Sequence, residues 1–117
     1  MADIRRNATV VGLALFMTVA ACNLKQQADT EFGDQHFKTA IALVELYKLR
    51  HGQYPEALTD LDFTGGWDKI AISSVQYHRL PEGYELNIIN GWVGRPTLKY
   101  PAQFWSGLGL KKSNAKP

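Results

Sequence analysis

Three histidines and two pairs of carboxylates are the side chains of this sequence that could bind a metal or carry catalysis. The histidines are His36, His51 and His78, and the pairs are Asp60 with Asp62 and Glu82 with Glu85. His36 and His51 lie near the two ends of one predicted helix. At 1.5 Å per residue they are about 22 Å apart, so they cannot share one ion. The spacing therefore predicts no metal site, and we also expect no cofactor.

The carboxylate pairs fall in predicted loops, where Asp and Glu side chains are normally solvated. Paired carboxylates can carry out acid and base catalysis when burial separates their pKa values. The sequence also lacks the Gly-x-Ser-x-Gly and His-Glu-x-x-His signatures of serine and zinc hydrolases. We therefore expect a protein that is not an enzyme.

Aromatic residues are concentrated in the C-terminal half of the chain. They include Trp67, Trp92, Tyr100, Phe104 and Trp105. Most of these rings are expected in the core, because each can bury roughly 150–250 Å². Trp92 is the candidate for an exposed binding residue, since the sequence NGWVGRP places it between two glycines in a predicted loop. Its expected partner is an envelope protein or, in the alternative, a sugar or peptide ligand.

The single cysteine, Cys22, closes an apolar run of about 14 residues that follows Arg5 and Arg6. A short basic segment, an apolar stretch and small residues before a cleavage point are the three regions of a signal peptide. A membrane-spanning helix needs about 20 apolar residues, and the polar sequence NLKQQADTEFGDQ follows this run at once. Residues 1–21 are therefore predicted to be a signal peptide.

The sequence Val19-Ala20-Ala21-Cys22 resembles the lipobox of bacterial lipoproteins. The resemblance implies that the chain is cut before Cys22, that Cys22 is acylated, and that the lipid holds the protein on the membrane. The next residue is Asn23, whereas Asp at this position favours inner-membrane retention in lipoproteins of Gram-negative bacteria. The implied location is thus the outer membrane, facing the periplasm. The alternatives are an ordinary secretory signal that carries a cysteine, and an uncleaved anchor.

The composition is that of a small globular domain, with 117 residues, 45% hydrophobic and 21% charged, and a formal net charge of +2. A nucleic-acid-binding protein usually concentrates basic residues on one stripe. Here only Lys111, Lys112 and Lys116 cluster, in a Ser/Asn/Pro-containing tail. We expect no nucleic-acid partner, and residues 111–117 are predicted to be a disordered tail.

A long helix is predicted from Phe32 to Arg50, because apolar residues recur at intervals of three and four. Asp29 or Thr30 is expected to cap its start, and Gly52 to mark its end. Lys38, Glu45 and Lys48 are expected on the exposed side of this helix. The polar residues 22–30 are predicted to be a lipidated tether.

Two strands are predicted over KIAISSVQYHRL and YELNII, joined by a turn at Pro81-Glu82-Gly83. In the second strand, Tyr84, Leu86 and Ile88 alternate onto one face. A change of phase at Ser73-Ser74 indicates a bulge or a late start to pairing in the first strand. The segments PTLKY and QFWSGLGL are expected to supply one or two more strands. The predicted fold over residues 31–110 is α+β, with the long helix packed on a small antiparallel sheet of three or four strands.

The segment AIALVELYKLRHGQYPEALTDL resembles the end of the long helix and the following turn in type IV pilins and type II secretion pseudopilins. The matching positions are Leu43, Tyr47, Gly52, Tyr54, Pro55 and Leu58. The resemblance implies a pilin-like fold. Two features differ from those families: a lipobox replaces the pilin leader, and no acidic calcium-binding cluster is evident near the C-terminus.

Together these features predict a lipid-anchored, non-enzymatic interaction or structural protein of the bacterial envelope, accessory to a secretion or pilus system. The alternative is a ligand-binding lipoprotein. The sequence predicts neither the partner nor the oligomeric state.

Overall fold

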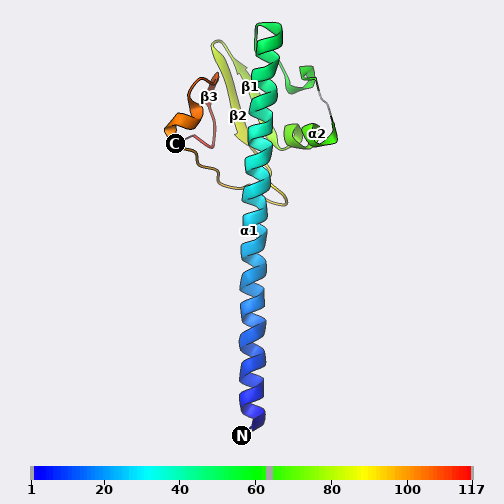
Figure 1. Ribbon diagram of the computed structural model, residues 1–117, viewed down its shortest axis with the longest axis vertical. Helices are drawn as coiled ribbons and strands as arrows, with labels where there is room; N and C mark the ends of the chain where they lie inside the picture. The colour runs from blue at the N-terminus through cyan, green and yellow to red at the C-terminus, as the bar shows by residue number, and fades with distance from the viewer. Residues whose placement is uncertain (1, 63–64, 117) are drawn as a thin grey trace.

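A single long helix, α1 (Ala2–His51), forms the spine of the molecule, and all other elements pack beside its C-terminal half (Figure 1). The structure is a computed structural model that describes residues 2–62 and 65–116, with the side chains of residues 2–22 outside the description. We call the compact part, residues 29–62 and 65–116, the head. The α+β fold class is as expected, and it is consistent with a pilin-like arrangement.

The predicted helix is confirmed, but α1 begins far earlier than Phe32. Residues 23–30, expected to be a tether, are helical. They lack Gly and Pro and are rich in good helix formers. Within this helical stretch the hydroxyl of Thr30 donates to the carbonyl of Gln26 at 3.0 Å. Neither Asp29 nor Thr30 therefore caps a helix start.

The end of α1 is as predicted. Gly52 adopts a left-handed conformation with φ of 81°, which a residue without Cβ takes at little cost. Its N–H donates to the carbonyl of Lys48 at 2.7 Å, closing the helix. The short helical turn expected after Pro55 is present as the 3-10 helix η1 (Leu58–Asp60).

The segment KIAIS is helical rather than extended, so the prediction of a strand there was wrong. Helix α2 (Gly66–Ser73) buries Ala71 and packs against α1. The hydroxyls of Ser73 and Ser74 both donate to the carbonyl of Ile70 at 2.8 Å. An apolar run of this length suits either a strand or a helix, and this bonding ends α2 so that pairing starts late, at Val75.

Strands β1 (Val75–Leu80) and β2 (Gly83–Ile88) form the predicted antiparallel hairpin. The third strand, β3 (Leu110–Lys112), pairs with β2 in parallel, giving the order β1-β2-β3. The sheet is thus mixed, whereas an antiparallel sheet was expected. Between β2 and β3 the chain passes through the 3-10 helix η2 (Ala102–Trp105) before it returns to the sheet. A long crossover of this kind allows two strands to pair in parallel. PTLKY forms no strand.

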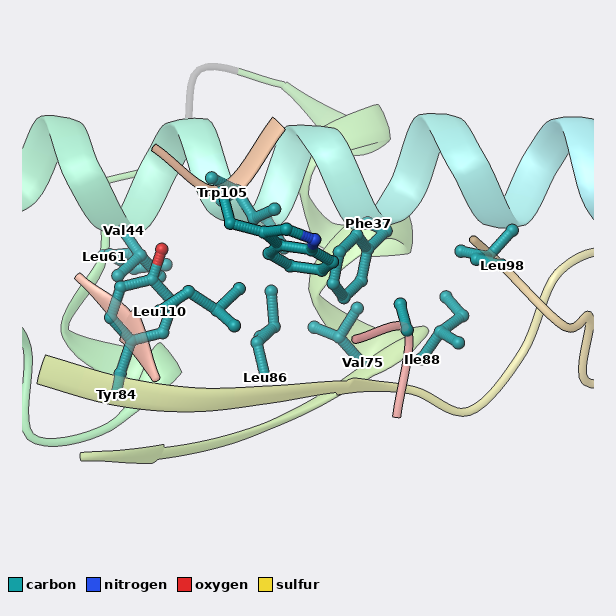
Figure 2. Close-up of a cluster of buried hydrophobic side chains, with 13 residues drawn as sticks. Phe37, Val44, Leu61, Val75, Tyr84, Leu86, Ile88, Leu98, Trp105 and Leu110 are labelled. Carbon is teal, nitrogen blue, oxygen red and sulfur yellow. The ribbon is translucent and has the colours of Figure 1, made fainter. Parts of the chain in front are cut away.

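The core lies between α1 and the sheet (Figure 2). Tyr84, Leu86 and Ile88 are fully or almost fully buried, so the predicted alternation in β2 is confirmed. Phe37 and Val44 of α1 face them with no exposed surface. This face of α1 is therefore committed to the core of the head.

The C-terminal residues 111–116 are ordered, in contrast to the predicted disordered tail. The amide of Asn114 bonds both backbone groups of Ile88, at 3.0 and 2.9 Å. Ala115 is 3% exposed, and the ammonium of Lys116 lies 5.5 Å from the centre of the Trp105 ring. Short polar residues at the end of a chain can thus be fixed by side-chain bonds to a strand end.

Among the described residues, no helix combines the length and the apolar character needed to cross a membrane.

Candidate functional site

The loop that follows β2, residues 89–95, is the candidate functional site, and we call it the Trp92 loop. The exposed fractions of Trp92 and Val93 are 61% and 59%. The predicted exposure of Trp92 is therefore confirmed, and its contact with a partner stays a prediction. The loop starts where the N–H groups of Ile89 and Asn90 both donate to the carbonyl of Ser74, at 2.8 and 3.2 Å.

Asp29 of α1 holds this loop through its carboxylate. The N–H groups of Trp92, Val93 and Gly94 all donate to Asp29 Oδ1, at 2.9, 2.8 and 3.0 Å. Successive backbone amides that converge on one oxygen form an anion-binding concavity. The bonds from Val93 and Gly94, with smaller contributions from Trp92 and the charge of Lys25, lower the pKa of Asp29. Asp29 is therefore ionised at neutral pH and fixes the loop to α1.

The glycine before Trp92 allows this close approach. A Cβ atom on Gly91 would lie 2.1 Å from the backbone oxygen of Asp29, in the middle of α1. A helix backbone cannot move aside for it, so only glycine fits at this contact. The N–H of Gly91 also donates to the carbonyl of Gly94 at 2.8 Å, which closes the loop on itself.

Sequence reasoning missed Asp29 as a site residue. The pair of glycines around Trp92 was visible and is typical of close backbone approach. The partner of that approach lies more than sixty residues earlier in the chain, and no local pattern connects the two.

A second carboxylate, Glu45, is enclosed by donors from three segments. The hydroxyls of Tyr54 and Tyr84 donate to it at 3.0 and 3.1 Å, and the N–H of Gly109 at 2.8 Å. We call these four residues the Glu45 cluster. Glu45 was expected on the exposed side of the helix, and that prediction was wrong because these polar groups offer it partners inside the head.

Both tyrosines of the Glu45 cluster stay protonated over the usual pH range. Burial, followed by the hydrogen bond that the Tyr54 hydroxyl donates to Glu45, raises the pKa of Tyr54 to about 12. Burial and the nearby Glu45 charge raise the pKa of Tyr84 still further. A Cβ atom on Gly109 would lie 2.0 Å from the Tyr54 hydroxyl oxygen. The Glu45 cluster is thus a tightly packed structural joint, in which each hydroxyl already serves as a donor.

A third carboxylate, Asp34, is bonded at both oxygens. The Tyr100 hydroxyl donates to Oδ1 at 2.7 Å, and Lys38 Nζ lies 3.0 Å from Oδ2. Burial and the bond to Asp34 raise the pKa of Tyr100. Two open grooves of about 410 and 290 Å³ flank Tyr100, along Thr97–Tyr100. Trp92 lines neither of them, so the exposed indole stands on a loop rather than in these hollows.

Trp105 fills the centre of the aromatic core. Its ring makes edge-to-face contacts with Phe37, Tyr100 and Phe104, at centroid distances of 6.2, 5.8 and 4.9 Å. Within the described residues, its buried Nε1 has no hydrogen-bond partner. Figure 2 shows this nitrogen beside the Phe37 ring, a position in which an aromatic face can partly replace an acceptor.

The three histidines lie in separate surroundings. His36 is 7% exposed and stacks on Phe32, and burial lowers its pKa below 6.5. His51 lies against Tyr47 at the end of α1, and His78 pairs with Glu85 across the hairpin. No group of three or more His, Cys, Asp or Glu residues in the described part of the chain could hold a metal ion.

In each carboxylate pair, one member accepts a local hydrogen bond and the other is exposed. Asp60 accepts the N–H of Ala57 at 3.2 Å, and Glu85 accepts from the side chain of Asn87 at 3.0 Å. Asp62 and Glu82 are exposed.

Cys22 belongs to α1 by its backbone, but its side chain lies outside the described residues, as do those of residues 2–21. The acylation of Cys22 therefore stays a prediction. Comparison of the chain with protein families, with curated proteins and with solved structures found no match in any of the three.

Proposed function

We propose that this chain is a lipid-anchored protein of the bacterial envelope that faces the periplasm and acts by binding rather than by catalysis. The observation that carries the proposal is the position of Cys22, at the end of an apolar run that follows two arginines. Charge, apolar stretch, small residues and cysteine agree at this one place. In α1 the same cysteine stands seven residues before Asp29, where the head begins.

A role in binding rather than in catalysis is supported by the hydrogen bonds of the carboxylates in the head. Glu45, Asp34 and Asp29 each accept bonds that join distant parts of the chain. A catalytic carboxylate needs access to a substrate and a pKa suited to proton transfer. These three carboxylates instead accept hydrogen bonds from within the head, and we assign them a structural role.

The segment around Tyr54 and Pro55 supports a more specific form of this proposal, in which a pilin-like head is accessory to a secretion or pilus system. These residues contribute to packing: the Tyr77 hydroxyl donates to the carbonyl of Pro55 at 2.5 Å, and Tyr54 contacts Tyr84 at a centroid distance of 5.0 Å. The alternative ligand-binding lipoprotein would use aromatic residues in a hollow. Trp92 protrudes from a loop, which favours contact with a broad surface.

Substitution of Cys22 tests the anchor. Cells that express the full chain or Cys22→Ala are labelled with radioactive palmitate, and the chain is then isolated. We expect label on the wild-type chain and none on the variant, which stays as a longer, uncleaved precursor. Trp92→Phe serves as the matched control and should retain the label. Equal labelling of the wild type and Cys22→Ala would contradict the proposal.

A further inference from the structure

The Trp92 loop lies at the end of the head from which the N-terminal part of α1 emerges. In Figure 1, only α1 continues beyond the level of this loop toward the N-terminus. Asp29, which binds the loop, follows Cys22 by seven residues of one helix. At 1.5 Å per residue this separation is about 10 Å along the helix axis. A lipid on Cys22 would therefore bring the Trp92 loop close to the membrane surface.

The residues in this zone have the composition of a membrane interface. Trp92 and Val93 are exposed, and Leu24 on the neighbouring turns of α1 is 66% exposed. Lys25 and Arg95 are exposed cations on the same two segments. Tryptophan is enriched where hydrocarbon meets headgroups, and basic residues bind anionic headgroups.

The acidic residues of this zone oppose binding to lipid only weakly. The carboxylate of Asp29 is stabilised by hydrogen bonds from three backbone N–H groups. Glu31 is the other acidic residue within residues 23–31, and residues 89–95 contain none. Lys25 and Arg95 thus balance the charges of Asp29 and Glu31, so no net negative charge opposes contact with an anionic or zwitterionic bilayer.

We infer that the Trp92 loop inserts its indole into the headgroup region of the phospholipid bilayer that holds Cys22. The inference rests on the proposed function, because it names the partner of the exposed loop on an anchored chain. The bonds to Asp29 keep the loop in place, so Trp92 and Val93 are presented without first having to be ordered. Lipid at Cys22 and an indole at the interface would together fix the orientation of the head.

A lipid surface fits this position better than a protein does. A protein that covered Trp92 would have to enter the space of about 10 Å between the loop and the lipid on Cys22. Lipid headgroups already fill such a space.

Tryptophan fluorescence of the full chain tests the inference. The acylated chain carrying Trp67→Phe is purified from membranes and reconstituted into vesicles of phosphatidylethanolamine and phosphatidylglycerol, so that Trp92 and the buried Trp105 remain as emitters. We expect a blue shift of the emission, and quenching by phospholipids brominated near the headgroup end of their acyl chains. The additional substitution Trp92→Phe should abolish both effects and leave the emission of Trp105.

Asp29→Asn provides a matched variant that keeps Trp92 but weakens its attachment to α1. We expect its quenching by brominated lipid to fall while quenching by acrylamide in water rises. Repeating the measurement on the Trp67→Phe chain in vesicles of pure phosphatidylcholine separates the contribution of the cations from that of the indole. Quenching of Trp92 by brominated lipid should then weaken without vanishing.

Flotation of the same vesicles separates the two proposals. If the chain floats with the vesicles but Trp92 is quenched by acrylamide and not by brominated lipid, the inference on the loop is overturned and the anchor stands. Crosslinking in cells from position 92 to a protein rather than to lipid would have the same meaning. A chain that stays in the aqueous phase would overturn both the anchor and the inference.

Discussion

Glu45 and Asp29 are two carboxylates of the same helix that bind the C-terminal half of the chain in different settings. They are sixteen residues apart, or about 24 Å along α1. Glu45 accepts two tyrosine hydroxyls, one of them fully buried, and one backbone amide. Asp29 accepts three successive amides of an exposed loop.

The difference between the two regions lies in what depends on each bond. Around Glu45, loss of the acceptor would strand buried donors in the core. Around Asp29, the freed amides can turn to water, since the loop is at the surface. One type of interaction thus holds the fold together at one end of α1 and positions an exposed side chain at the other.

The largest expected effect comes from breaking the core on which both regions depend. Ile41 is 6% exposed and faces the sheet side of α1. Ile41→Asp places an unpaired charge there, which should lower the free energy of unfolding by about 3–5 kcal/mol. A domain of this size has only about 5–15 kcal/mol in total, so the head should be largely unfolded. Urea denaturation followed by circular dichroism measures the change.

Leu49→Asp is the matched control, because Leu49 is on the same helix and 83% exposed. Its effect should stay within about 0.5 kcal/mol. A greater loss for Leu49→Asp than for Ile41→Asp would show that the register of α1 is wrong.

The next largest effect is expected at the Glu45 cluster. Glu45→Ala leaves the hydroxyl of Tyr84 and the N–H of Gly109 without an acceptor, which should lower the free energy of unfolding by about 3 kcal/mol. Glu45→Gln retains an acceptor oxygen and should lose about 1 kcal/mol. Chemical denaturation of both variants gives the ranking. If Glu45→Ala unfolds at the wild-type urea concentration, the Glu45 cluster is not a structural joint.

A moderate, pH-dependent effect is expected at His36, which lies between the two carboxylates. Its pKa in the folded head lies below 6.5, so above pH 6.5 both folded and unfolded states are neutral and its contribution to stability is complete. As the pH falls below 6.5, the unfolded state takes up a proton first and stability decreases. Melting temperatures between about pH 7.5 and about pH 5 should show this loss.

His36→Leu should flatten that part of the pH profile. An unaltered slope in His36→Leu would assign the pH dependence to another group.

The smallest effect on the whole head, and the most local one, is expected at Asp29. Asp29→Asn should leave the melting curve almost unchanged. The amide hydrogens of Trp92, Val93 and Gly94 should exchange about tenfold faster or more, because they lose a charged acceptor. Hydrogen exchange measured by NMR resolves these positions.

Acid should reproduce the effect of Asp29→Asn. The folded-state pKa of Asp29 lies below the usual 3.8, so its contribution is complete above pH 3.8 and is lost as the pH falls through the lower folded value. Exchange at the amide of Ile88, which Asn114 binds, serves as the internal control. Loss of the whole fold on Asp29→Asn would erase the contrast between the two regions.

The parts of the fold that depend on neighbouring residues were predictable from the sequence. The helix over Phe32–Arg50, its end at Gly52, the turn at Pro81-Glu82 and the alternation of β2 all follow from local periodicity and from Gly and Pro. The exposure of Trp92 follows in the same way from its flanking glycines.

The parts that depend on distant partners were not predictable. From its neighbours in the sequence, Glu45 is expected to be an exposed charge, because the donors Tyr84 and Gly109 lie far along the chain. Helix α2 carries an apolar run that also suits a strand, and its contact with α1 decides the outcome. The C-terminal tail is polar and short, yet Asn114 is ordered because the end of β2 offers it two backbone groups.

The parallel pairing of β3 with β2 has a consequence for the order in which the head can be assembled. The bond between Glu45 and Gly109 spans 64 residues, and that between Asp29 and Gly94 spans 65. Contacts of such high sequence separation slow folding, because a long loop must close before they form. A nascent chain that still lacks residues 109–115 has neither the third strand nor the amide of Gly109 that Glu45 accepts. The head therefore closes only after residues 109–115 have been synthesised.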